Sequence, residues 1–380
     1  MKPCLRVTAC ARVTTFARVT ACAMAAACLT IGLVGCGGAG QPSGPGGHTT
    51  GKGGMTIGLL LPVNHTPRWE TYDRPLIEKK IKELCRDCTV QYANAEGDVA
   101  TQKQQVEAAI SKGVDALILS SVDSTASAPS VKEAREAHIP VVSYDHLANG
   151  PISGYVSFDG EQVGRLQAHA LLQAMGDKAK GGRIVMMNGD PADPNTTRFK
   201  KGALSVLEGK VRIGKAYDTA GWRPENANLN MSGAIAALGA NSIDGVYAAN
   251  DGLATGVISA LKAAKIKPLP PVTGQDAELA AVQRIVAGEQ YMTVYKPFKP
   301  EADAAAEMAV ALARGEKLNH IATTKVNGPT AKNIPAVLLT PISVTLPHIK
   351  DTVIKGGMYT TSQICTPKYK TACDRAGLTK

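Results

Sequence analysis

Short apolar segments alternate with amphipathic helical segments from Met55 onward, and this alternation restricts the chain to very few folds. The first apolar segments are rich in β-branched residues and read MTIGLLLP, TVQYANA, ALILSS and IPVVSYD. Residues 98–113 have a helical pattern, with Asp98 as the N-cap and Gly113 as the C-terminal stop. The residues on the apolar face of this helix are Val99, Val106 and Ile110. Continuous apolar strands joined by helices predict a parallel sheet that is covered on both faces.

The same alternation starts again in the second half of the chain. The apolar segments there read GRIVMMNG, VRIGKAYD, DGVYAAND, PPVTGQDAE and YMTVYKP. About 325 residues follow the N-terminal segments, which is more than one small core accommodates and is typical of two domains. We therefore predict an α/β fold of two doubly wound parallel-sheet lobes.

Residues 1–35 resemble a signal peptide. They carry four basic residues and no acidic residue, and they end in the apolar run VTACAMAAACLTIGLVG; a transmembrane helix is the weaker alternative. Cys36 completes LVGC, which resembles a bacterial lipobox, in which the cysteine is lipidated; a chance cysteine near an ordinary cleavage site is the other interpretation. Residues 36–54 are rich in Gly, Pro and Ser and predict a flexible tether. We expect an extracytoplasmic protein, anchored by lipid to the outer face of the bacterial cytoplasmic membrane.

The net charge argues against nucleic acid as a partner. The whole chain has 42 Lys and Arg against 32 Asp and Glu, and removal of the four basic residues of the signal leaves +6. No run of basic residues is interleaved with aromatic residues, so the chain lacks the footprint of a nucleic-acid-binding protein.

Four cysteines remain once the signal and Cys36 are removed. An even number in an exported protein favours disulfides, and four cysteines allow three pairings. A redox or metal-binding pair in CRDC is the alternative, but the second half has no matching CxxC or nearby pair of histidines. We expect no metal site and two structural bridges, Cys85 with Cys88 and Cys365 with Cys373.

Polar residues follow the predicted strands at the points where the strands end. In doubly wound sheets, ligands bind beyond the carboxyl ends of the strands. Any one of these residues alone could be a helix N-cap, but five strand ends from both lobes indicate one cleft between the lobes. The residues are Asp145, Asn188, Asn250 with Asp251, Asp276 and Lys296.

The chemistry of these side chains suits a sugar. Hydroxyl groups both donate and accept hydrogen bonds, so carboxylates, amides and guanidinium groups pair with them well. The two tryptophans of the chain, Trp69 and Trp222, each stand beside an arginine in a polar, proline-containing segment. We expect both indoles to be platforms for the apolar C–H faces of a pyranose; an exposed tryptophan on a lobe surface is the alternative. A slot between two indoles favours D-xylose, whose ring hydroxyls can all lie equatorial, over D-ribose, which keeps an axial hydroxyl.

Six segments resemble the D-xylose-binding proteins of ABC transporters, in the ribose-binding-like periplasmic group. They occur in order between about residues 55 and 358 and read PRWETYDR, SYDHL, SFDGEQVGRLQA, GWRPENA, GQDAELAAVQRIVAGEQYMTVYKP and LLTPISV…IKDTVIKGG. Proteins of this group usually have arginine after the fourth-strand aspartate, whereas this chain has His146, which offers one donor and one acceptor when neutral. The ligand-binding residues that the resemblance implies are Arg68, Trp69, Asp145, His146, Asn195, Trp222, Asn250, Asp276 and Lys296.

The resemblance also implies a function and a domain division. The protein would be a type I periplasmic binding protein that captures an aldopentose, D-xylose, and hands it to an ABC permease without covalent chemistry. Its N-terminal lobe would comprise residues 55–157 and 296–337, and its C-terminal lobe residues 158–295 and 338–380. A three-segment hinge would join them, with crossovers near residues 157–159, 293–296 and 338–341. We expect a monomer that needs no cofactor.

Three other functions share parts of this pattern. A secreted glycosidase would use two carboxylates such as Asp145 and Asp276, but the other strand-end residues are mostly Asn, Arg and Lys, and the G-x-S-x-G, H-E-x-x-H and P-loop motifs are absent. A sugar-responsive repressor would need a basic helix-turn-helix before residue 55, where the signal and the tether stand. A sensor that presents another monosaccharide, such as glucose or arabinose, to a membrane receptor stays open.

Overall fold

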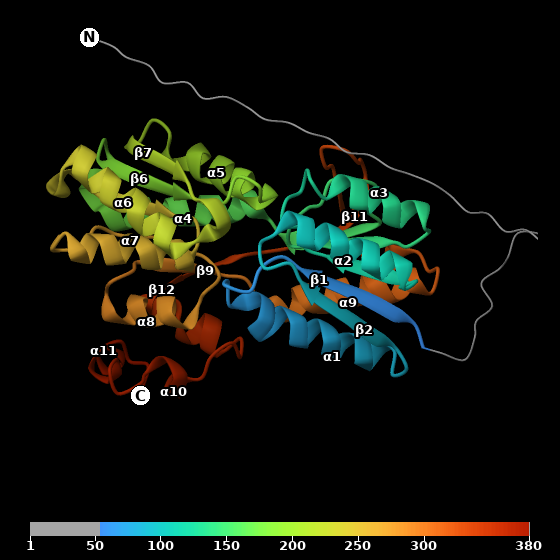
Figure 1. The fold of residues 1–380 in the computed structure, drawn as a ribbon. Helices are drawn as coiled ribbons and strands as arrows, with labels where there is room; N and C mark the ends of the chain where they lie inside the picture. Colours follow the sequence, from blue (N-terminus) through green and yellow to red (C-terminus); the bar gives the residue numbers. More distant parts are fainter. Residues whose placement is uncertain (1–53, 380) are drawn as a thin grey trace, which may run out of the picture. The chain divides into compact units, whose positions relative to one another are not determined.

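A seven-stranded sheet is the larger of the two main sheets in the computed structural model, which describes residues 54–379 (Figure 1). The predicted signal, Cys36 and residues 36–53 of the tether lie outside the described residues. Among residues 54–379, no helix is both long and apolar enough to cross a membrane. The strand order is β10-β11-β5-β4-β3-β1-β2. The bounds are β1 Thr56–Leu61, β2 Thr89–Asn94, β3 Ala116–Leu119, β4 Val141–Tyr144, β5 Gly154–Phe158, β10 Thr324–Val326 and β11 Ile334–Leu339.

Helices cover both faces of this sheet, as its apolar strands predict. All neighbouring strands are parallel except β10, which pairs antiparallel with β11 at the edge. Successive residues of β1 point to opposite faces, so Leu59 packs in the core under α1 and α9, and Leu60 packs in the core under α2 and α3. The helices are α1 Arg74–Leu84, α2 Val99–Ser111, α3 Ala128–Glu136 and α9 Phe298–Ala313. We call this sheet with its helices and loops the seven-stranded half.

The helix predicted at residues 98–113 is present as α2. The carboxylate of Asp98 accepts a hydrogen bond from the Thr101 N–H at 2.6 Å, so it is the N-cap. Val106 is buried, but the Val99 side chain is 41% exposed. Val99 lines the same small pocket as Val106, so the two residues share a face as predicted, but Val99 is only partly covered.

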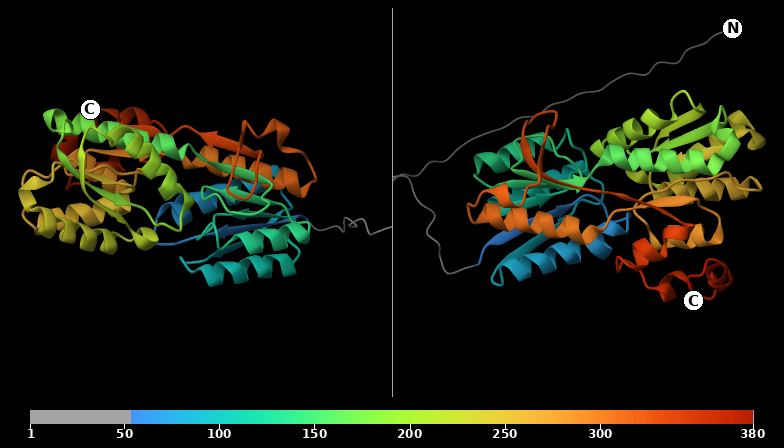
Figure 2. Two further views of the ribbon diagram at one scale, coloured as in Figure 1. Left: turned by 90° about the horizontal axis from the view of Figure 1, so that it is seen from above. Right: turned by 180° about the vertical axis from the view of Figure 1, so that it is seen from behind.

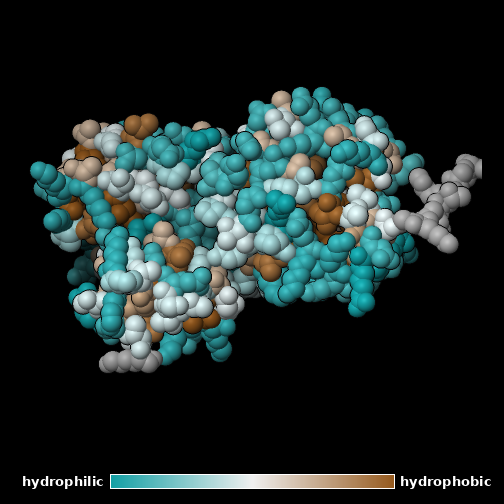
Figure 3. Space-filling view, turned by 60° about the horizontal axis from the view of Figure 1, so that its bottom comes forward, coloured by the Kyte–Doolittle hydropathy of each residue, from teal (hydrophilic) through white to brown (hydrophobic). Residues whose placement is uncertain are grey.

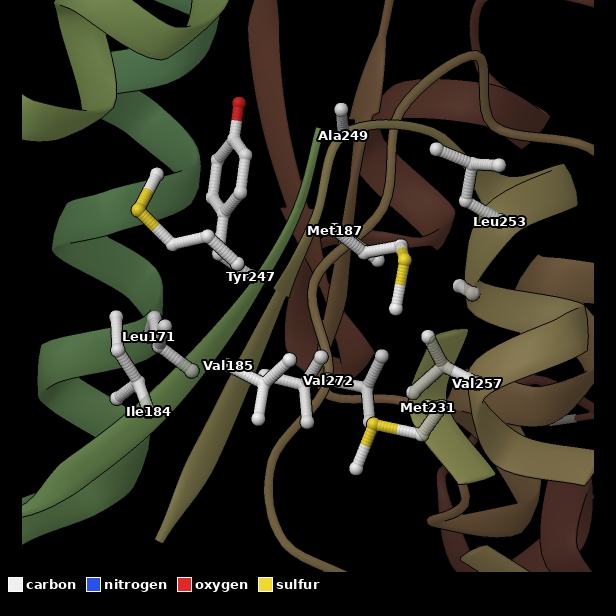
Figure 4. Packing of buried hydrophobic residues seen from close by; sticks show 14 of the residues in the cluster. Leu171, Ile184, Val185, Met187, Met231, Tyr247, Ala249, Leu253, Val257 and Val272 are labelled. Atoms are coloured by element: carbon white, nitrogen blue, oxygen red, sulfur yellow. The ribbon is translucent and has the colours of Figure 1, made fainter. Parts of the chain in front are cut away.

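A second, three-stranded parallel sheet has the order β7-β6-β8. Its central strand β6 is sandwiched between helices, and Figure 4 shows Leu171 beside Ile184 on one side and Met231 and Val257 on the other. The strands are β6 Arg183–Asn188, β7 Arg212–Asp218 and β8 Gly245–Ala248. The helices around them are α4 Gly160–Met175, α5 Pro194–Leu207, α6 Pro224–Leu238 and α7 Asp251–Ala263.

The predicted segments PPVTGQDAE and YMTVYKP continue the parallel arrangement, but less regularly than expected. Val272 bridges Val246 in parallel, and the Tyr291 and Val294 N–H groups donate to the carbonyl oxygens of Val272 and Gly274. The second segment forms β9 (Met292–Tyr295), which on its other side pairs antiparallel with β12 (Ile342–Thr345). The two strands run antiparallel because the chain after β9 leads to the seven-stranded half, whereas the chain from β11 into β12 leads away from it. Figure 2 shows the orange-red β11–β12 segment passing from one sheet to the other.

The chain passes between the sheets at three places, and all described residues belong to one compact unit. It leaves the seven-stranded sheet after Phe158, returns after Tyr295 and leaves again between Leu339 and Ile342. We call the three-stranded sheet, the β9–β12 pair and their helices and loops the three-stranded half. Shorter helical turns lie at Trp69–Asp73, Gly176–Ala179, Ala220–Trp222, Ala240–Ser242, Leu318–His320, Leu346–His348 and Lys350–Ile354.

The C-terminal residues form an appendage on the three-stranded half. A disulfide joins Cys365 to Cys373, and the buried Cys373 packs in a core with Val282 and Ile285 of α8. A second disulfide joins Cys85 to Cys88 at the end of α1. The helices here are α8 Leu279–Ala287, α10 Thr361–Ile364 and α11 Lys370–Arg375. On the face drawn in Figure 3, hydrophobic residues are scattered among hydrophilic ones, as on an ordinary surface.

Candidate functional site

A cavity of about 250 Å³ lies between the two halves, beyond the carboxyl ends of the strands. It is close in size to the smaller ligand pockets of proteins. The seven-stranded half contributes loops after β1 and β4, and the three-stranded half contributes loops after β6, β7 and β8. All nine residues of the predicted ligand set line this cavity: Arg68, Trp69, Asp145, His146, Asn195, Trp222, Asn250, Asp276 and Lys296.

Arg68 is the centre of a buried ionic cluster. Its guanidinium donates from Nε to Asp73 at 2.8 Å, from Nη1 to Asp145 at 2.6 Å and from Nη2 to Glu301 at 2.8 Å. Nη2 also donates to the second oxygen of Asp73 at 3.1 Å. Because a guanidinium has five N–H groups, only one N–H on Nη1 remains for a ligand. Arg68 therefore holds three carboxylates in place more than it contacts a ligand directly.

The cluster shifts the pKa values of the carboxyl groups that contact Arg68. Burial alone would raise the pKa of Asp145, but Arg68 and Lys296 outweigh burial and lower it well below its usual range. Burial raises the pKa of Glu301 well above its usual value in spite of Arg68. The second oxygen of Glu301, Oε1, has no hydrogen-bond partner among the described residues. Asp145 thus faces the cavity as an ionised acceptor.

Lys296 lies between two carboxylates of the cavity wall. Its Nζ is 3.0 Å from Asp276 and 3.6 Å from Asp145. Burial disfavours the ammonium charge, but these two carboxylates outweigh burial and raise the pKa of Lys296. The contact with Asp276 is an ion pair without hydrogen-bond geometry, so Asp276 Oδ1 is left free to accept a hydrogen bond.

Side chains of the two halves contact each other at several points around the cavity. Asn195 Nδ2 donates to Asp145 Oδ1 at 2.7 Å. His65 Nε2 donates to the Gly221 carbonyl oxygen at 2.7 Å. His146 Nε2 lies 3.1 Å from Asp193 Oδ2. The structure is therefore a closed arrangement in which the halves contact each other directly.

Both indoles face the cavity, so the alternative of tryptophans on a lobe surface is wrong. Trp69 is only 3% exposed, and the Arg68 guanidinium covers one of its faces at 4.4 Å from the ring centre. Trp222 donates from Nε1 to Asp193 at 3.1 Å and packs edge-on against Phe199. The prediction of a slot between two indoles needs one correction. One face of Trp69 is not available to a ligand, because the Arg68 guanidinium covers it.

Three of the cavity residues have a left-handed backbone. The φ angles are +56° at Asp145, +55° at Trp222 and +90° at Asp276. Residues other than glycine rarely adopt such angles; aspartate tolerates them better than most, and for the bulky Trp222 the cost is about 1–3 kcal/mol. Strain of this kind is common where a protein must aim a side chain into a binding site.

Two strand-end residues that the sequence placed at the cleft do not line the cavity. Asn188 donates to Asp218 at 3.0 Å instead. Asp251 is fully buried and accepts from Gln290 at 2.7 Å and from Thr293 at 2.8 Å. Asn250 is both a helix N-cap and a cleft residue. Its side-chain oxygen accepts a hydrogen bond from the Leu253 N–H at the start of α7, and the residue also lines the cavity.

Several cavity residues were absent from the predicted set. Asp193 is the N-cap of α5, and its place directly before Pro194 is a signal that could have identified it. Gln275 precedes Asp276, and its buried Oε1 has no hydrogen-bond partner. An unpaired buried acceptor beside a cavity is available to a ligand hydroxyl. The other additional residues include His65, Asp190 and Phe199.

The fold and the site are those of a known family. The family profile described as periplasmic binding protein domain matches residues 57–317. The chain belongs to the periplasmic binding protein family. The D-xylose-binding periplasmic protein of Escherichia coli is 40% identical to this family member over 82% of the chain and 92% of its own length.

Other relatives align over a similar share of the chain but are named for different ligands. A multiple sugar-binding periplasmic receptor of Rhizobium radiobacter is 31% identical over 81% of this chain and 92% of its own length. An ABC transporter solute-binding protein of Clostridium phytofermentans, solved with β-D-glucose, superposes with a TM-score of 0.75 at 28% identity. That alignment covers 81% of this chain and 99% of the solved chain. The similarity therefore shows the family and leaves the sugar open.

Proposed function

We propose that the protein is an extracytoplasmic solute-binding protein that captures an aldopentose, D-xylose, in the cavity and delivers it to an ABC permease. The observation that supports this proposal is the convergence of all nine predicted ligand residues on one cavity. The 40% identity to a protein named for D-xylose binding supports the choice of sugar. We take the protein to work as a monomer.

The cavity offers the groups that a pyranose needs. Asp145, Asp276 and the unpaired oxygen of Gln275 accept hydrogen bonds from hydroxyl groups. The amides and Lys296 donate to hydroxyl oxygens, and the indole of Trp222 packs on apolar C–H groups. A glycosidase would need a carboxylic acid with a raised pKa. The depressed pKa of Asp145 argues against that role and supports binding without covalent chemistry.

The lobes that we propose are residues 55–157 with 296–337 and residues 158–295 with 338–380. The pairing of β11 with β5, and of β12 with β9, supports this division. The three chain passages between the sheets would then be the hinge. A sugar that contacts both lobes stabilises the closed state relative to the open state. The size of this effect is the difference between the binding free energies of the sugar for the two states.

The proposed specificity can be measured by isothermal titration calorimetry on purified residues 37–380. We expect D-xylose to bind with micromolar affinity, which corresponds to about −8 kcal/mol. We expect D-ribose to bind at least about tenfold more weakly, because its axial hydroxyl would lie unpaired against an indole. Equal or tighter binding of D-ribose would contradict the assignment of D-xylose.

A sensor that presents another monosaccharide to a membrane receptor is the second candidate. The solved relative with bound glucose supports it, as does the relative named a receptor. Glucose differs from D-xylose by an exocyclic CH2OH at the ring edge, so the loops around Arg68 and His146 decide between them. Tighter binding of glucose than of D-xylose in the same titrations would favour this candidate.

We also propose that Cys36 is lipidated after cleavage of residues 1–35. The motif LVGC and the tether that follows it support this proposal. In the producing cell, Cys36→Ala should move the protein from the membrane fraction to the soluble fraction or the medium, because lipid chains would be its membrane attachment. Fractionation that finds the variant and the natural protein equally in the membrane would refute the lipid anchor.

A further inference from the structure

Asp251 is a buried carboxylate that does not line the cavity, although it directly follows Asn250 at the start of α7. Donors converge on both of its oxygen atoms. Oδ1 accepts a hydrogen bond from the side-chain amide of Gln290 at 2.7 Å. Oδ2 accepts from the hydroxyl of Thr293 at 2.8 Å and from the backbone N–H of Glu278 at 2.9 Å. The carboxylate therefore joins α7 to β9 and to the loop that precedes α8.

The loop of residues 275–278 carries acceptors of the cavity wall on an unusual backbone. Gln275 and Asp276 line the cavity, and their atoms Oε1 and Oδ1 are buried without a hydrogen-bond partner among the described residues. The φ angles are +90° at Asp276 and +51° at Ala277. Angles of this kind persist only where the surrounding structure fixes them. The direction in which the two acceptors point therefore depends on the contacts that hold the loop.

Asp251 and Thr293 hold this loop at both of its ends. The backbone N–H of Asp251 donates to the carbonyl oxygen of Gln275 at 3.0 Å, and its carboxylate accepts from the Glu278 N–H. The Thr293 hydroxyl donates to this carboxylate and accepts from the Ala277 N–H at 3.1 Å. One carboxylate and one hydroxyl thus satisfy the N–H groups of the two residues that follow the cavity aspartate.

The packing around Asp251 leaves its carboxylate little freedom to move. A Cβ at Gly274 would lie 1.9 Å from Asp251 Oδ1, so only glycine leaves room for this oxygen. Gln290 is fixed as well, because its Oε1 accepts from Arg284 Nε at 3.0 Å and its Nε2 also donates to the Met292 carbonyl oxygen at 3.0 Å. The Gln290 amide cannot turn over without losing both contacts, so it always presents a donor to residue 251.

We propose that Asp251 and Thr293 are positioning residues for the sugar: they hold the loop of residues 275–278 in the backbone conformation that directs Asp276 and Gln275 at a ligand hydroxyl. This inference rests on the proposed sugar-binding function. Neither residue contacts the sugar in this account. They act through the loop, because a binding group keeps its geometry only when the hydrogen bonds behind it are made.

The first test is calorimetric titration of Asp251→Asn with D-xylose. Burial raises the pKa of Asp251 to about 7, so the titrations are made at pH 8.5, where the natural carboxyl group is ionised. Asparagine has the same size but only one oxygen, so its NH2 group must face either the Gln290 amide or the Glu278 N–H. We expect the affinity to fall at least about tenfold, because the loop loses a hydrogen bond that holds it.

Two substitutions of Thr293 separate positioning from stability. Thr293→Val keeps the shape and removes the hydroxyl, and we again expect an affinity at least about tenfold lower. Thr293→Ser keeps the hydroxyl, and we expect a change of less than about threefold. Serine removes a buried methyl group and lowers stability, so a purely structural role would weaken binding in this variant too.

Asp244→Asn is the matched control in the same half. Asp244 directly precedes β8, at the opposite end of the strand from Asn250. Its carboxylate also accepts from a backbone N–H, that of Arg183 at 2.8 Å, and it pairs with Lys178 at 2.9 Å. We expect this variant to bind D-xylose with the natural affinity. A loss equal to that of Asp251→Asn would mean that any such bond in this half affects binding, and the positioning role would be wrong.

Hydrogen–deuterium exchange of the sugar-free proteins separates failure of this inference from failure of the proposed function. We expect the amides of residues 275–278 to exchange at least about fivefold faster in Asp251→Asn and Thr293→Val than in the natural protein and Thr293→Ser. If the natural protein binds D-xylose and both variants keep its affinity, the positioning role is wrong and the binding function stands. If no sugar binds to the natural protein, the function is wrong, and unchanged exchange would overturn the role of Asp251 as well. Should Asp251→Asn not fold, as judged by circular dichroism, the two Thr293 variants decide the question.

Discussion

Replacing Arg68 with methionine should lower the free energy of unfolding by about 3–5 kcal/mol, because the change leaves buried charges without a partner. The guanidinium holds Asp73, Asp145 and Glu301, each of which is almost completely buried. Methionine keeps much of the apolar volume of the side chain, so the decrease in the free energy of unfolding is due mainly to the removal of the charge. Urea denaturation followed by circular dichroism at pH 7.5 measures it.

The pH dependence of this variant separates charge from packing. Without Arg68, burial raises the pKa of Asp145 and raises the pKa values of Asp73 and Glu301 further, so these carboxyl groups take up protons as the pH falls. The folded variant then binds more protons than its unfolded chain, and its deficit relative to the natural protein should shrink from pH 7.5 to pH 5. A loss below about 1 kcal/mol, or a deficit that grows in acid, would contradict the central role of Arg68.

Arg74→Met is the matched control for Arg68. Arg74 also pairs with two carboxylates, Glu78 at 2.9 Å and Glu70 at 3.5 Å, but its side chain is 39% exposed. Exposed ion pairs contribute about 0–1 kcal/mol, so we expect a correspondingly small loss. The comparison therefore measures the effect of burial on the same kind of interaction.

Replacing Trp222 with alanine should weaken the binding of every sugar by about thirtyfold or more, as expected for a large side chain that dominates a binding surface. The indole is both a wall of the cavity and a donor to Asp193. Calorimetric titration with D-xylose measures the change. A less than threefold effect would show that the indole is not a platform for the ligand.

Gly189→Ala tests the same platform without removing it. A Cβ at Gly189 would lie 1.9 Å from the Cη2 atom of Trp222, so the indole must move. We expect affinity for D-xylose to fall about tenfold in this variant, as for a displaced hot-spot side chain. The control is Gly233→Ala in α6, where the nearest atom would be 3.9 Å away and where alanine favours the helix. Unchanged affinity in Gly189→Ala would mean that the position of Trp222 is not important for binding.

The sequence predicted those parts of the fold and site that depend on local pattern. Apolar runs gave the strands of both main sheets, and polar residues at their carboxyl ends marked the cavity. Positions such as Asp145 and Lys296 could be predicted because the end of a parallel strand leads to the same edge of a sheet whatever the loop that follows.

Contacts between segments far apart in the chain could not be predicted in the same way. Glu301 is 233 residues from Arg68 in sequence and lies in α9, where its carboxylate resembles any helix glutamate. The antiparallel pairing of β9 with β12 depends on the directions in which two chain passages run, and no local pattern records those directions. Asp193 could be recognised as a helix N-cap, but its pairing with His146 arises only when the halves meet.

The left-handed backbone at Asp145, Trp222 and Asp276 bears on attempts to convert this protein into a biosensor for another sugar. Asparagine and aspartate accept such angles at lower cost than most residues, so substitution of Asp145 or Asp276 by another kind of side chain would add backbone strain. Asn195 and Asn250 have ordinary helical and extended backbones and line the same cavity. Redesign of the ligand preference is therefore better directed at these two amides, where a new side chain changes the chemistry of the wall and leaves the backbone unstrained.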